Sequence, residues 1–97
     1  MKILILCNHG NVRSVALKYL IQRLYDHDVL AAGVEENSQL TLNMLQGWAD
    51  KVITLTKEAH NLVPNSIFID VGKDIWFNPF AQDLHHLLLK RIKGLNL

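Results

Sequence analysis

The chain has 97 residues, of which 49% are hydrophobic and 20% are charged, and its formal net charge is +1. This length fits one domain with one modest core, so we treat residues 1–97 as a single domain. A charge so close to zero removes the electrostatic argument for binding nucleic acid or an anionic membrane.

Cellular location is suggested by two simple features. The chain has one cysteine, which excludes an internal disulfide and is typical of a reducing compartment. No apolar run reaches the 18 residues of a membrane-spanning helix, and the apolar start at residues 3–6 is too short for a signal peptide. We therefore expect a cytoplasmic protein without a membrane partner.

The first half of the chain alternates short apolar runs with an amphipathic stretch. Residues 3–6 form a continuous run of branched apolar side chains, which is typical of a buried strand. Residues 14–26 then follow helical spacing, and residues 28–33 predict a second strand that ends at a glycine. The predicted helix places on one stripe Leu17, Leu20, Ile21 and Leu24.

The second half repeats this alternation. Ser38 is the expected N-cap of a short helix that ends near Gly47, and residues 51–55 predict a third strand. Thr56 would cap a helix that stops before Pro64. Residues 66–70 predict a fourth strand.

A last helix is expected from Pro79, with Asn78 as its cap, to Gly94. Its expected core face consists of Leu84, Leu87, Leu88 and Ile92. Four strand-helix alternations predict a doubly wound α/β domain, in which helices flank a parallel four-stranded sheet. Ligands of such sheets bind beyond the carboxyl ends of the strands.

The loop that follows the first strand lies at this edge and carries the candidate chemistry. Cys7 precedes, in this order, Asn8, His9, Gly10, Asn11, Val12, Arg13 and Ser14. Backbone N–H groups of such a loop, at a helix N-terminus, can hold an oxyanion, and Arg13 can bind two of its oxygens. The helix dipole and Arg13 would favour the Cys7 thiolate, to which the Ser14 hydroxyl could donate a hydrogen bond.

Each of these residues alone also has a simpler interpretation. Cys7 could be a small buried hydrophobic residue, Ser14 a helix N-cap, His9 a solvated loop residue and Arg13 a surface charge. Their joint spacing, with five residues between Cys7 and Arg13, favours an oxyanion-binding loop with a nucleophilic cysteine.

The pattern Cys-x-x-Gly-x-x-Arg-Ser at residues 7–14 resembles the signature of cysteine-dependent protein tyrosine phosphatases. Its place after the first strand resembles the low-molecular-weight family, as do Ala31-Ala32-Gly33 and residues 48–60. The resemblance covers residues 1 to about 80. It implies the sheet order 2-1-3-4, a phosphocysteine on Cys7, stabilisation of the phosphoryl group by Arg13, amides of residues 8–13 around its oxygens, and no cofactor.

The general acid is where the sequence departs from this family, which carries an Asp-Pro or Asp-Asp pair after the fourth strand. Asn78-Pro79 stands in this region, and asparagine cannot donate the proton. We expect Asp74 to be the general acid, with Asp70 as the alternative, although each could be a solvated or strand-end carboxylate. Trp76 and Phe77 could line an aromatic pocket or pack in the core.

Three functions remain open. The first is a phosphomonoesterase acting on a phosphorylated protein, most simply at phosphotyrosine, or on a small aryl phosphate. The second is a protein that binds such a phosphate without turnover. The third is a phosphocysteine carrier of the sugar-phosphotransferase type, against which Arg13 counts. Arsenate reduction would need an external thiol. We expect no metal site, because adjacent His85 and His86 point about 100° apart on a helix.

Overall fold

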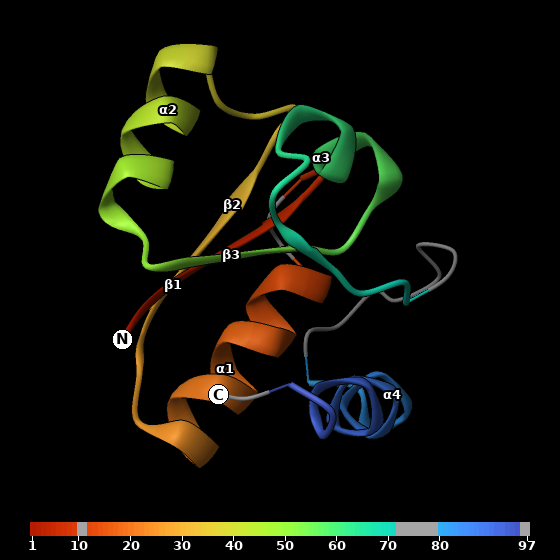
Figure 1. Ribbon diagram of the computed structural model, residues 1–97. Helices are drawn as coiled ribbons and strands as arrows, with labels where there is room; N and C mark the ends of the chain where they lie inside the picture. Colours follow the sequence, from red (N-terminus) through yellow and green to blue (C-terminus); the bar gives the residue numbers. More distant parts are fainter. Residues whose placement is uncertain (10–11, 72–79, 96–97) are drawn as a thin grey trace.

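The computed structural model describes residues 1–9, 12–71 and 80–95, in which four strands and four helices alternate along the chain (Figure 1). The strands are β1 (Lys2–Cys7), β2 (Asp28–Gly33), β3 (Lys51–Thr54) and β4 (Ile67–Phe68). The helices are α1 (Arg13–Tyr25), α2 (Gln39–Trp48), α3 (Lys57–Leu62) and α4 (Gln82–Ile92). None of these helices is both long and apolar enough to cross a membrane.

The strands form one parallel sheet in the order β2-β1-β3-β4. β1 is central: Ile5 lies opposite Ala31 of β2 on one side and Ile53 of β3 on the other. This confirms the predicted α/β class, the parallel four-stranded sheet and its strand order. The segment that follows β1 therefore lies between the segments that follow β2 and β3.

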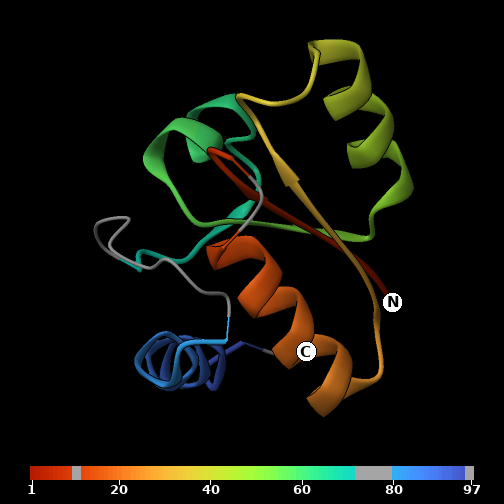
Figure 2. The same cartoon turned by 180° about the vertical axis from the view of Figure 1, so that it is seen from behind.

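Helices cover both faces of the sheet, as Figures 1 and 2 show from opposite sides. Ile3 and Ile5 of β1 pack in one cluster with α1 and α4, whereas Leu4 and Leu6 pack in a second cluster with α2 and α3. Because both faces of β1 are buried, its sequence is a continuous apolar run rather than an alternating one. This packing fixes the carboxyl end of β1, where Cys7 lies.

Two helices begin at the predicted caps. The Ser38 hydroxyl oxygen accepts the N–H of Thr41 at 3.2 Å, and the Thr56 hydroxyl oxygen accepts the N–H of Ala59 at 3.1 Å. Each bond satisfies a backbone donor that has no partner within its own helix. Thr56 thereby fixes the start of α3 beside the carboxyl end of β1.

Three details of the prediction were wrong. Leu24 is 53% exposed, so the buried stripe of α1 ends at Ile21. β4 pairs only at Ile67 and Phe68, because β3 ends at Thr54, which lies opposite Phe68. α4 begins at Gln82 rather than at residue 79. Phe80 lies in a turn before this helix, and its ring packs edge-on against the ring of Tyr19, with 5.2 Å between the ring centroids.

Candidate active site

The predicted oxyanion loop begins at the carboxyl end of β1 and runs into α1. The Cys7 carbonyl accepts the N–H of Val34 at 2.8 Å, and the Asn8 carbonyl accepts the N–H of Glu35 at 2.9 Å. These bonds continue the pairing of β1 and β2 past the end of the sheet. They fix the first residues of the loop, whereas the predicted site residues Gly10 and Asn11 lie outside the described residues.

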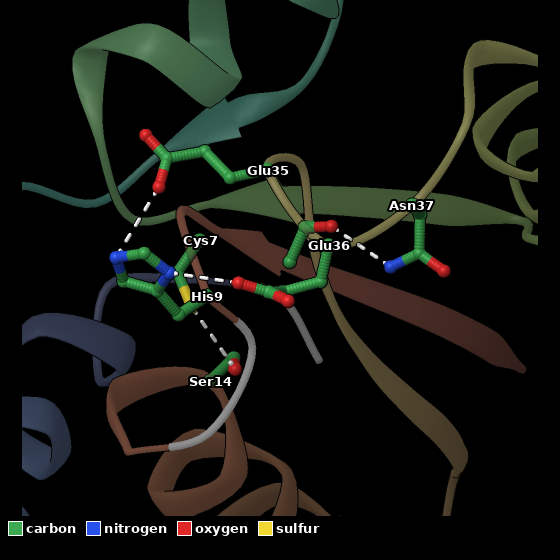
Figure 3. Close-up of polar contacts among 7 residues, drawn as sticks. Cys7, His9, Ser14, Glu35, Glu36 and Asn37 are labelled. Atoms are coloured by element: carbon green, nitrogen blue, oxygen red, sulfur yellow. Dashed lines mark hydrogen bonds and ion pairs between the residues drawn. The ribbon is translucent and has the colours of Figure 1, made fainter.

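Cys7 and Ser14 form the inner part of the site (Figure 3). Their Sγ and Oγ atoms are 3.2 Å apart, Cys7 is 2% exposed, and Ser14 is fully buried. The thiol can donate to the hydroxyl oxygen, and in the thiolate form the hydroxyl donates to the sulfur. Val12, which makes no side-chain hydrogen bond, occupies the N-cap position of α1. The Ser14 hydroxyl is therefore directed to the sulfur rather than used as a cap.

Arg13, the first residue of α1, is turned inward and is only 6% exposed. It lines a cavity of about 280 Å³. The other lining residues are Asn8, Leu55, Thr56, Lys57, Glu58, Phe68 and Asp70. A cavity at this place leaves room for an oxyanion beside the guanidinium, whose N–H donors could bind its oxygens.

The cavity unites side chains from three carboxyl strand ends. Asn8 follows β1, the stretch from Leu55 follows β3, and Asp70 follows β4. The half-buried Phe68 ring provides an aromatic wall. The structure thus brings Asn8, Arg13 and Asp70 together. Asp74, Trp76 and Phe77 lie outside the described residues.

Cys7 lies apart from the described wall of this cavity. Its side chain belongs to the core cluster on the α1 side of the sheet, beside Ile5. Cys7 is therefore a small buried residue of the core, as its simpler interpretation had it, and its sulfur also faces the Ser14 hydroxyl, as the predicted site required.

Thr56 connects the loop to α3. Its hydroxyl donates to Asn8 Oδ1 at 2.8 Å while its oxygen accepts the N–H of Ala59. One side chain, 7% exposed, thus caps α3 and orients Asn8. The sequence indicated the capping role, but the contact with Asn8 depends on the neighbouring positions of β1 and β3.

Gly33 ends β2 where the loop backbone passes closest. A Cβ atom at this position would lie 2.3 Å from the His9 carbonyl carbon, 2.6 Å from its oxygen and 2.7 Å from its Cα. All three are backbone atoms, so no side-chain rotation could relieve the contact. Gly33 therefore permits the loop to lie against β2.

His9 lies between two carboxylates from the segment after β2 (Figure 3). Its Nε2 is 3.2 Å from Glu35 Oε2, and its Nδ1 is 3.1 Å from Glu36 Oε1. Ionised carboxylates only accept hydrogen bonds, so both nitrogens must carry a proton for both bonds to form. Asn37 holds the same segment by donating to the Gly33 carbonyl at 2.8 Å.

Neither Glu35 nor Glu36 was predicted to be a site residue from the sequence. The signal was the acidic pair just past the glycine that ends the second strand, at the carboxyl edge of the sheet. Phe68 was likewise assigned only to a strand.

The chain matches no protein-family model, and no similar protein was found among curated proteins or among solved structures. Among the residues that the structure describes, no three His, Cys, Asp or Glu side chains are grouped so that they could hold a metal ion.

Proposed function

We propose that this protein is a cysteine-dependent phosphatase that hydrolyses phosphomonoesters, with phosphotyrosine as the preferred class, on a fold of the low-molecular-weight phosphatase type. The observation that carries the proposal is the inward-turned Arg13 on a cavity wall, one residue before the Ser14 hydroxyl that faces the Cys7 sulfur. We further propose that it acts in the cytoplasm.

Binding of the phosphoryl group is the first step of the proposal. Arg13 would supply two parallel N–H donors, and backbone amides at the start of α1 would supply others. α1 has 13 residues, long enough for its aligned peptide dipoles to favour an anion at the first turn. A bound dianion would then lie between the guanidinium and the start of the helix.

Transfer to the enzyme is the second step. The Cys7 thiolate attacks phosphorus, the S–P bond forms, and the bond from phosphorus to the ester oxygen breaks. A carboxylic acid gives its proton to the leaving oxygen. Water then attacks the phosphocysteine and gives its proton to the resulting carboxylate, and the S–P bond breaks to release phosphate. In this last step the Ser14 hydroxyl would donate a hydrogen bond to the departing thiolate, since its Oγ lies 3.2 Å from the Cys7 Sγ.

Two aspartates remain candidates for the acid. Asp70 lies on the cavity wall with Arg13, whereas Asp74 belongs to the segment outside the described residues. Comparison of Asp70→Asn with Asp74→Asn separates them. The variant that lacks the acid should lose turnover mainly for esters with poor leaving groups.

The cavity has room and apolar surface for an aromatic ester among its mostly polar lining residues. Phe68 and Leu55 supply apolar surface beside Arg13. A volume of about 280 Å³ exceeds the roughly 150 Å³ that admits a benzene ring in other proteins. These features support phosphotyrosine or a small aryl phosphate as the substrate.

The test is turnover of p-nitrophenyl phosphate by the wild type and by Cys7→Ser. The proposal predicts hydrolysis by the wild type and its loss in Cys7→Ser, with phosphate affinity retained because Arg13 and the amides remain. Equal rates in the two proteins would reject the nucleophilic role of Cys7.

The burial of Cys7 favours a second candidate, which is recognition of a phosphorylated partner without turnover. Cys7 is 2% exposed and does not line the described cavity, so its sulfur is less accessible to a substrate than Arg13, which does line it. This candidate predicts phosphate binding by calorimetry that Arg13→Ala abolishes, together with no hydrolysis that depends on Cys7.

A further inference from the structure

The charges around the candidate site point to a preference among substrates. On the cavity wall, Lys57 is accompanied by two carboxylates, Glu58 and Asp70. Arg13, the remaining cation of the wall, is buried and is assigned to the phosphoryl group. Among the described lining residues, the side chains left for the rest of a substrate therefore carry a net negative charge while Asp70 is ionised.

The opposite flank of the loop has the same sign. Glu35 and Glu36 follow β2, and β2 and β3 lie on either side of β1 in the sheet. Their side chains are 54% and 61% exposed, so their charges reach solvent. His9 lies between them and, when protonated, offsets one of the two charges.

The carboxylates of the two flanks, Glu58 and Asp70 on the cavity wall and Glu35 and Glu36 after β2, would face only those parts of a substrate that lie beyond its phosphoryl group. The phosphoryl group itself would contact Arg13 and the amides of α1, whereas neighbouring residues of a phosphopeptide would extend over the flanks. Negative neighbours would be repelled by Glu35, Glu36 and Glu58, and positive neighbours attracted. Like charges placed at a binding surface are a common means of rejecting a competing ligand.

We infer that the site selects phosphotyrosine peptides with Lys or Arg beside the phosphotyrosine over peptides with Asp or Glu there. This inference rests on the proposed phosphatase function and names its substrate class. Because the carboxylates on the flanks are exposed, the preference is a screened, moderate one: about three- to tenfold in kcat/KM at low ionic strength, and smaller at high salt.

The test uses two phosphotyrosine peptides that differ only in two Lys or two Glu residues beside the phosphotyrosine. The wild type should show the higher kcat/KM for the Lys peptide, and 0.5 M salt should reduce the ratio, since the screening length falls to about 4 Å. In Glu36→Gln/Glu58→Gln the ratio should approach one. Glutamine keeps an acceptor for His9 Nδ1 while removing the charge.

A matched variant tests the sign of the effect. Lys57→Gln removes the lysine of the described cavity wall and should increase the preference for the Lys peptide. Equal rates for both peptides in the wild type, a faster Glu peptide, or a ratio unchanged by salt would each overturn the inference. Failure to hydrolyse p-nitrophenyl phosphate, which has no flanking residues, would instead reject the proposed function itself.

Discussion

Replacing Gly33 with alanine is expected to disturb the proposed oxyanion loop from a position outside it. The new Cβ would lie 2.3 Å from the His9 carbonyl carbon, whereas ordinary van der Waals contact of a Cβ atom begins near 3.4 Å. The loop or the end of β2 must therefore move by about 1 Å. Such a movement would strain two backbone hydrogen bonds, one from the N–H of Val34 to the Cys7 carbonyl and one from the N–H of Glu35 to the Asn8 carbonyl.

The size of the effect follows from this geometry. Forced overpacking in a closely packed region costs about 1–3 kcal/mol of folding free energy. A misplacement of about 1 Å in a site built on positioning can reduce turnover about 100-fold. We therefore expect Gly33→Ala to lose stability moderately and the proposed phosphatase activity severely.

The assay pairs urea unfolding with the kcat/KM for an aryl phosphate. Gly47→Ala is the matched control, because a Cβ at Gly47 in α2 would meet nothing within 4 Å. That change should raise stability by about 0.5–1 kcal/mol, since alanine favours a helix over glycine, and should leave activity unchanged. Wild-type stability and activity in Gly33→Ala would refute the close approach of the loop to β2.

Three further changes probe other parts of the molecule. Thr56→Val should cost about 1–2 kcal/mol in urea unfolding because it removes the cap of α3, while Thr56→Ser should stay close to the wild type; equal losses would contradict the capping role. Ser14→Ala should lower kcat about 10- to 100-fold with phosphate affinity retained, and lost affinity would contradict its role toward sulfur. Leu88→Ala, at a fully buried position of α4, should cost about 2–5 kcal/mol in thermal unfolding, whereas Leu40→Ala, 70% exposed, should change stability by less than about 0.5 kcal/mol.

The features that could be predicted from the sequence are those encoded by neighbouring residues. The apolar run of β1, and the caps at Ser38 and Thr56, each require only a few consecutive residues. The alternation of such segments then restricts the domain to a parallel α/β sheet. The placement of Cys7 at the carboxyl end of β1 follows from the same reasoning.

The contacts missed by the sequence analysis join separate strands. Gly33 meets His9, and Thr56 meets Asn8, because β2 and β3 both pair with β1 in a particular register. Periodicity within one segment does not contain that register. The exposure of Leu24 has a similar cause, since its helical position matches Leu17 but the burial of a stripe depends on what packs against each turn.

The central claim, a phosphoryl group carried on the cysteine at the end of β1, is tested most directly by the intact mass of protein quenched in acid during turnover of an aryl phosphate. We predict that a fraction of the wild type carries the added mass of one phosphoryl group, that peptide fragmentation assigns it to Cys7, and that Cys7→Ala carries none. Rapid turnover without such an adduct, or the same adduct in Cys7→Ala, would contradict the account.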